Sequence, residues 1–136
     1  MPKMVLLAQY FSVNGTDVSA HTRKAELAME VEDKDVTTYG SLGWKEVRGG
    51  LKSGEIGAEF LQDVAAGAID SIMWPLFGTV VPFEARADQA AVSASNPKYT
   101  GNILIKEWKP LEGGVGDEAS VSVTYPTSGA VTRATS

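Results

Sequence analysis

The chain has 136 residues, with 12 lysines and arginines against 17 aspartates and glutamates, and it contains no cysteine. A chain of this length can bury about two-thirds of its unfolded surface, so it needs no metal or disulfide to fold. Without cysteine it has no thiolate nucleophile and no Cys-ligated metal site. Its net charge of −5 argues against affinity for phosphate backbones, which bind clustered lysine and arginine.

The N-terminal segment from Met1 to Gln9 carries one charge and a short apolar run. This run is too short for a signal peptide with its cleavage site, and no other stretch approaches the ~20 apolar residues that a membrane helix needs. We therefore expect residues 1–136 to form a single soluble domain, made in a cytoplasm, without a membrane partner.

Alternation with a period of two dominates the first part of the chain. After a weak strand from Met4 to Val13, Asn14-Gly15 predicts a tight hairpin turn. From Arg23 to Asp33, charged residues alternate with alanine, leucine, methionine and valine. That pattern predicts a strand with one buried face and one wet face.

A glycine-rich segment from Asp33 to Gly54 follows and contains Tyr39 and Trp44. A connection of this length without secondary structure is uncommon in a compact domain and is usually functional or disordered. We expect a long mobile loop here. The next strand, Glu55 to Leu61, again alternates apolar and acidic or small residues.

One short helix interrupts the strands. Apolar residues recur at helical spacing from Ile69 to Met73, and Pro75 disfavours helical geometry in the residue before it. We predict a helix over about residues 66–75, with Trp74 in the core beneath it. A helix this short is stable only when it packs on a sheet.

Further strands complete the pattern, and they are predicted at Val80 to Ala87, Asn102 to Trp108, Ala119 to Tyr125 and Ala130 to Thr135. Strands on both sides of one helix predict a mainly β fold. The expected architecture is an antiparallel β-sandwich or partly closed barrel with one short flanking α-helix.

The residues that usually carry chemistry are scarce. His21 is the only histidine and lies in a polar turn, so we expect a surface residue rather than a catalytic base. Pairs such as Glu26 and Glu30, or Glu55 and Glu59, could serve as acid and base on a sugar, but exposed strand carboxylates are common. We predict no enzymatic activity, no metal and no cofactor.

The order of several motifs resembles that of tail tube proteins, the major tail proteins of bacteriophages with long non-contractile tails. The resemblance covers nearly the whole chain and rests on these segments: Asp35 to Gly40, Gly49 to Lys52, Glu59 to Asp63, Trp74 to Gly78, Pro82-Phe83, the turn Pro110-Leu111-Glu112-Gly113-Gly114-Val115-Gly116-Asp117, the strand to Tyr125, and Arg133-Ala134-Thr135. We expect no extra immunoglobulin-like decoration of the kind that some members carry.

The resemblance implies a structural virion protein of the phage tail. Six copies would close into a ring, and rings would stack into a hollow tube through which DNA leaves the capsid. Its partners would be other copies of itself, a tape-measure protein, and tail terminator and tip proteins, with double-stranded DNA passing without specific binding. Assembly would take place in the cytoplasm of the host bacterium.

Two surfaces are candidates for these contacts. The wet faces of the two alternating strands would line the channel with Glu26, Glu30, Glu32, Glu55 and Glu59, and such a wall repels phosphates. The alternative is that these glutamates only solubilise an outer face. The segment 33–54 would reach the neighbouring ring through Tyr39, Leu42, Trp44, Lys45 and Arg48.

Two other functions remain open at this point. A tube protein of a contractile tail or of a type VI-like secretion system would share this architecture. A β-sandwich module that binds a ligand such as a carbohydrate would need an exposed aromatic platform, which Trp44, Trp74 and Trp108 are too scattered in the sequence to indicate.

Overall fold

Two antiparallel β-sheets face each other in the computed structural model, which describes residues 4–136. Residues 1–3 of the apolar N-terminal run lie outside the described part of the chain. The strands are β1 (Tyr10–Val13), β2 (Thr16–Asp17), β3 (Thr22–Asp35), β4 (Val47–Leu61), β5 (Val80–Arg86), β6 (Lys98–Leu104), β7 (Ser120–Pro126) and β8 (Thr132–Ala134).

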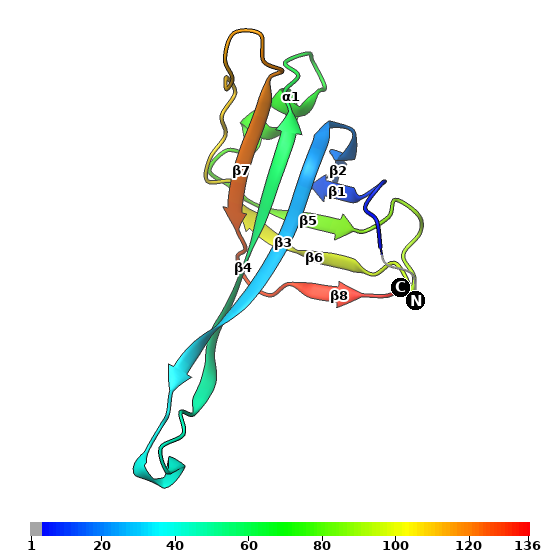
Figure 1. Cartoon of the computed structure of the whole chain (residues 1–136). Coiled ribbons are helices and arrows are strands. Elements are labelled where there is room, and N and C mark those ends of the chain that lie inside the picture. The colour runs from blue at the N-terminus through cyan, green and yellow to red at the C-terminus, as the bar shows by residue number, and fades with distance from the viewer. Residues whose placement is uncertain (1–3) are drawn as a thin grey trace.

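Within residues 4–136 one sheet has five strands in the order β2-β1-β5-β6-β8, and the other has three in the order β3-β4-β7. The strands of the two sheets cross steeply, with α1 at one end of the three-stranded sheet (Figure 1). The predicted fold class, a mainly β protein with one short helix, is confirmed. The two sheets form a sandwich and do not close into a barrel.

The predicted hairpin turn joins β1 to β2. Asn14 and Gly15 both have positive φ, 53° and 78°, and Val13 pairs with Thr16 across them. This is the geometry of a two-residue turn whose twist matches that of the flanking strands. The Asn-Gly dipeptide therefore specifies this turn locally.

The β3–β4 hairpin is the longest feature of the fold. Its pairing runs from Thr22 opposite Phe60 to Asp35 opposite Val47, with irregularities between Thr22 and Lys24 and between Val31 and Asp33. Its outer half leaves the body of the protein as a twisted two-stranded extension (Figure 1). We call residues 30–53 the ribbon.

The expected loop over residues 33–54 is wrong in extent. Both of its ends belong to strands, and only residues 36–46 lie between β3 and β4. These form the ribbon tip, which contains a short 3-10 turn at Tyr39–Ser41. Glycines at 49, 50 and 54 do not break β4, because the pairing with β3 satisfies its backbone.

The core lies between the two sheets and is built by alternation. The three-stranded sheet contributes the buried residues Ile56, Ala58, Phe60, Val121, Val123 and Tyr125, and the five-stranded sheet contributes Phe11, Val13, Val81, Phe83, Ala85 and Ile103. Phe60 lies at the centre, with its ring centroid 6.4 Å from that of Phe11 and 6.0 Å from that of Trp108. These contacts hold the two sheets together.

The helix α1 (Ile69–Met73) is shorter than predicted and continues into a 3-10 turn at Trp74–Leu76. Ile69 and Met73 are fully buried against the core. The prediction that Trp74 is a core residue is wrong, because its side chain is 60% exposed. Ile69 and Met73 are one helical turn apart and set the buried stripe, so the next residue points about 100° away from it.

Besides β4, the strands that differ most from their predicted bounds are β1 and β6. β1 begins only at Tyr10, and β6 ends at Leu104 instead of Trp108. The chain leaves the sheet at Ile105, which exchanges backbone hydrogen bonds with Thr79 and Gly78. Trp108 nevertheless stays buried, and its indole N–H donates to the carboxylate of Asp70 in α1 at 2.9 Å.

Replacing Phe60 by alanine should lower the free energy of unfolding by about 3–5 kcal/mol, because it leaves a cavity between the two sheets. The matched control is Phe77→Ala, which removes the same side chain from a half-exposed position and should cost about 1 kcal/mol or less. Denaturant unfolding followed by circular dichroism measures both. Equal losses would contradict the placement of Phe60 at the centre of the core.

Candidate assembly surfaces

The outer face of the three-stranded sheet carries the predicted glutamates. Lys24 lies opposite Glu59 and Glu26 lies opposite Gly57, while Ile56 and Ala58 alternate with them toward the core. A shallow hollow on this face is shared by all three strands and is lined by Lys24, Glu26, Glu55, Glu59, Ser122 and Thr124. The structure therefore brings Glu26, Glu55 and Glu59 together on one face.

Glu30 and Glu32 continue this face along β3 into the ribbon. Glu30 lies opposite Ser53, and the Glu32 carboxylate pairs with the Lys34 ammonium at 3.0 Å. The face therefore presents five glutamates, with Lys24 and Lys34 as its lysines. Like charges that line one surface sum to a potential of one sign over it. This surface is the glutamate face.

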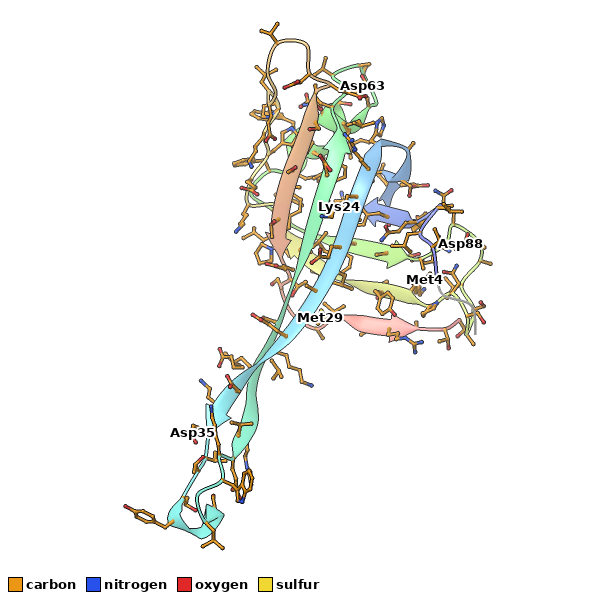
Figure 2. All side chains as sticks on the ribbon, viewed as in Figure 1. Met4, Lys24, Met29, Asp35, Asp63 and Asp88 are labelled. Atoms are coloured by element: carbon orange, nitrogen blue, oxygen red, sulfur yellow. The ribbon has the colours of Figure 1, made fainter. Side chains whose placement is uncertain are left out.

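The opposite side of β3 was expected to pack on the core along its whole length. Ala25 and Leu27 are half-buried there, but Met29 is 52% exposed because the ribbon leaves the body at this point (Figure 2). The Met29 side chain instead covers Gly54, where an added Cβ would come within 2.6 Å of its sulfur. A larger residue at position 54 would therefore displace the flexible end of the Met29 side chain.

The ribbon tip projects apolar side chains into solvent. Tyr39 is fully exposed, and Leu42 and Trp44 are 85% and 78% exposed. Tyr39 and Leu42 line a common hollow, whereas Trp44 does not take part in it. Of the other two residues proposed for this contact, Lys45 lies in the ribbon tip and Arg48 in β4, and both are exposed.

Hydrogen bonds give the ribbon tip a defined shape. The Thr37 hydroxyl lies 2.8 Å from the backbone N–H of Glu46, which donates to it, and the Thr37 backbone N–H donates to the Asp35 carboxylate. Hydrogen bonds from the side chain and backbone of Thr37 lower the pKa of Asp35. A left-handed Leu42 (φ 52°) reverses the chain. These contacts define a hydrogen-bonded turn at the ribbon tip.

The segment between β6 and β7 holds functional candidates that sequence reasoning missed. The Tyr125 hydroxyl donates to the backbone carbonyl of Glu107 at 2.9 Å, and the Gln62 side-chain amide donates to the carbonyl of Pro110 at 2.7 Å. These bonds fix the segment beside β7. No pattern in the sequence predicts them, because they join positions that lie far apart along the chain.

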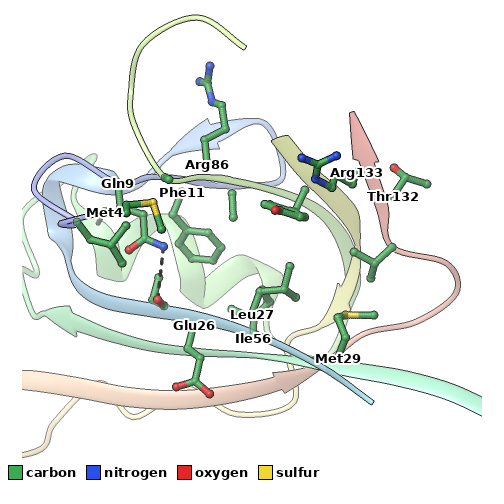
Figure 3. Close-up of a pocket in the computed structure, with 16 residues that line it drawn as sticks. Met4, Gln9, Phe11, Glu26, Leu27, Met29, Ile56, Arg86, Thr132 and Arg133 are labelled. Carbon is green, nitrogen blue, oxygen red and sulfur yellow. Dashed lines mark hydrogen bonds between the residues drawn. The ribbon is translucent and has the colours of Figure 1, made fainter. Parts of the chain in front are cut away.

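An apolar groove lies between the two sheets beside β3. Phe11, Leu27, Met29 and Ile56 are among its lining residues (Figure 3). Of the charged residues around it, Arg86 is engaged by Glu84 at 3.0 Å and by the ring of Tyr10 at 4.0 Å. Most of the groove's lining is apolar and includes the core residues Phe11, Ile56 and Ala85.

Across residues 4–136, no three histidine, cysteine, aspartate or glutamate side chains lie close enough together to hold a metal ion. His21 is half-buried in a 3-10 turn at Ser19–His21. In the same part of the chain, no helix has both the length and the apolar character needed to cross a membrane.

Comparison with known proteins gives a clear result at the level of structure. The fold matches a chain in the virion of a native gene transfer agent particle with a TM-score of 0.73 and 21% identity, covering 92% of this chain and 94% of the other. It also matches a chain in the tail of an empty gene transfer agent particle, determined with C6 symmetry, with a TM-score of 0.69 and 20% identity over 93% of both chains.

The fold is shared with chains of a gene transfer agent particle. No protein-family model matches the sequence. No curated protein matches it either. The matches extend over nearly the full length of both chains, so the shared architecture includes both sheets and the β3–β4 hairpin.

The buried hydroxyl of Tyr125 predicts an alkaline instability. Burial, together with the nearby Glu107 carboxylate, raises the pKa of Tyr125 above its ordinary value of 10.0. The folded state then holds this proton more tightly than the unfolded state, so stability is lost as the pH rises above about 10. Tyr125→Phe should reduce that loss by up to about 1.4 kcal/mol per pH unit.

Denaturant unfolding of both proteins between pH 8 and 11 measures this difference. At pH 8 the variant should be about 1 kcal/mol less stable than the parent, since it lacks the hydrogen bond to Glu107. Parallel stability curves above pH 10 would show that the Tyr125 hydroxyl ionises freely.

Proposed function

We propose that this chain is a tail tube protein, a structural virion component that polymerises as stacked hexameric rings into a hollow tube for DNA delivery. The observation that carries the proposal is the structural match, over 93% of both chains, to a chain in a tail with C6 symmetry. The assembly surfaces of this chain support it independently. They comprise a sheet with two free edges, a glutamate face and an apolar ribbon tip.

Ring formation follows from the three-stranded sheet. Its outer strands, β3 and β7, each have a neighbour on one side only within residues 4–136. A sheet edge presents unpaired N–H and C=O groups that favour association with another strand. Six copies joined edge to edge remove all such edges, as any closed barrel does.

The glutamate face is proposed to line the channel. The core side of the same sheet is covered by the five-stranded sheet, which leaves the glutamate face as the side of this sheet available to line the bore of a ring closed through β3 and β7. A negative wall repels the DNA phosphates and lets the duplex slide without being held. The alternative is that these glutamates only solubilise an outer surface. It predicts that changing their charge leaves DNA passage unaffected.

Stacking of the rings is assigned to the ribbon tip. The ribbon extends beyond the body of the subunit (Figure 2). Its tip carries Tyr39, Leu42 and Trp44 in exposed positions. Aromatic residues often contribute most of the binding energy at interfaces. Lys45 and Arg48 would lie at the rim of this contact, where charges affect the rate and orientation of association.

The remaining partners follow from the same proposal. Such a tube would assemble in the cytoplasm of a host bacterium around a tape-measure protein and end at tail terminator and tip proteins. The subunit would act by shape and charge, without enzymatic activity or a cofactor. The proposal favours a long non-contractile tail over a contractile or secretion-system tube, and over a carbohydrate-binding module.

The purified chain should form rings or hollow tubes at high concentration or with a viral nucleator, and electron microscopy would show them. Trp44→Ala should prevent tube growth while leaving the monomer fold unchanged, because it removes an exposed anchor of the ribbon tip. The matched control is Trp74→Ala, which removes an exposed tryptophan outside the ribbon and should leave tube growth intact. A chain that stays monomeric under all conditions would exclude the proposed function.

Reversing the charge of the glutamate face tests the channel. Particles carrying Glu26→Lys, Glu30→Lys, Glu55→Lys and Glu59→Lys should assemble but eject DNA slowly or not at all, since the wall would then attract phosphates. The glutamine versions at the same four positions remove the repulsion without adding attraction and should give an intermediate rate. Normal ejection from the lysine particles, measured by DNA release, would place these residues outside the channel.

A further inference from the structure

Side chains form hydrogen bonds to both outer edges of the three-stranded sheet, where no further strand is paired within residues 4–136. Successive N–H groups of a strand point to alternate edges, so Ser122 and Thr124 of β7 direct their N–H groups to the same side. The Thr124 N–H donates to the Glu107 carboxylate at 3.1 Å, and the Ser122 N–H donates to the Glu112 carboxylate at 3.4 Å. Two carboxylates thus take the places that the carbonyls of a further strand would occupy.

The segment that carries these carboxylates is held beside β7 by its backbone. The Tyr125 hydroxyl donates to the carbonyl of Glu107, and the Gln62 amide donates to the carbonyl of Pro110. Neither bond uses a glutamate side chain. The carboxylates are therefore free to swing away from β7 while the segment stays in place.

We call a side chain that bonds to a sheet edge in this way a cap. On the β3 edge the cap is a hydrogen-bond donor instead of an acceptor. The side-chain amide of Gln9 donates to the backbone carbonyl of Ala25 at 3.4 Å, as the dashed line in Figure 3 shows. Gln9 belongs to the segment before β1, which lies along β3 near Arg23, Lys24 and Ala25. On β7 the capped groups are N–H donors, and on β3 the capped group is a C=O acceptor.

We infer that these side chains are exchangeable caps, and that the partner that displaces them is the opposite edge of a second copy of this chain. The uncapped N–H groups of Ser122 and Thr124 in β7 would then bond to carbonyls of β3 in the neighbouring copy, where Ala25 is freed from Gln9. This rests on the proposed function, because it describes the junction between subunits of a ring.

The polarity of this junction is fixed by the topology. β3 and β7 both run antiparallel to β4, so they point in the same direction within one chain. Rotation about an axis along the strands preserves their direction. Each junction in a ring therefore joins β7 of one copy to β3 of the next in parallel.

The lengths of the capping bonds favour exchange. At 3.1–3.4 Å they are at or beyond the long end of the usual range for N–H···O bonds. The two on β7 are exposed to solvent, where water competes with them. They are strong enough to occupy an edge that would otherwise favour indiscriminate pairing, and weak enough for a matching strand to replace them.

The double variant Glu107→Ala with Glu112→Ala removes both caps from β7 and keeps the backbone carbonyl that Tyr125 uses. We expect the threshold concentration for self-assembly, measured by light scattering and sedimentation, to fall by roughly tenfold. In the monomer, the amides of Ser122 and Thr124 should exchange faster with solvent. Glu118→Ala, in the same segment and without a hydrogen bond to β7, is the control and should change neither quantity.

The glutamine pair Glu107→Gln with Glu112→Gln keeps an acceptor oxygen without the charge, and it should lower the threshold by a smaller factor. It also serves as the test variant if the alanine pair does not fold. In tubes of the unmodified chain, the Ser122 and Thr124 amides should be strongly protected. An unchanged threshold in a folded variant, or equal exchange of these amides in monomer and tube, would overturn the inference.

The two proposals fail in different ways. If the unmodified chain forms tubes but the variants assemble at an unchanged threshold concentration, only the inference about the caps is rejected. An unmodified chain that forms neither rings nor tubes overturns both the caps and the proposed function.

Discussion

The register of β4 is the constraint on which the rest of the structure depends. Through residues 55–60 this strand pairs with β3 on one side and β7 on the other, and it buries Ile56, Ala58 and Phe60. Side chains alternate strictly between the faces of a strand, so the core contacts determine which residues face outward. A slip by one residue would expose Phe60 and bury Glu59, which no arrangement of this core could accommodate.

Because β4 continues unbroken into the ribbon, the core also positions groups that never touch it. The pairing with β3 carries the register outward from Phe60 to Val47. It thereby places Glu30 on the same side as Glu26 and presents the tip at a fixed orientation. The body supplies the free energy that holds the ribbon in line, since an isolated two-stranded hairpin is marginally stable in water.

Sequence reasoning succeeds where one face of an element is buried and the other is wet. β7 and the inner halves of β3 and β4 have that environment, and their alternation is clear in the sequence. The Asn14-Gly15 turn is equally predictable, because both residues tolerate the positive φ that it requires. The same alternation predicts a common face for Glu26, Glu55 and Glu59, and the pairing of β3 with β4 has that arrangement.

The ribbon and the helix end show why other features are not predictable. Both faces of the ribbon are exposed, so residues 47–53 carry no alternation and their glycines suggest a loop. The apolar character of Trp74 suggests a core residue, but its place one residue after the buried stripe puts it in solvent. The caps on β7 depend on how the segment before that strand folds back against its edge, which a local pattern does not encode.

The irregular pairing between Val31 and Asp33 has a consequence for how such subunits can vary in size. An irregularity at the root of the ribbon shifts the pairing of the outer strands relative to that of the body, while the ladder continues through it. Removing two residues from each strand beyond it would shorten the extension by about 7 Å and keep every remaining side chain on its own face. An odd number would invert the faces. The length of the ribbon can therefore change only by an even number of residues in each strand. Homologues or engineered subunits with a different distance between stacked rings should differ by even insertions in β3 and β4.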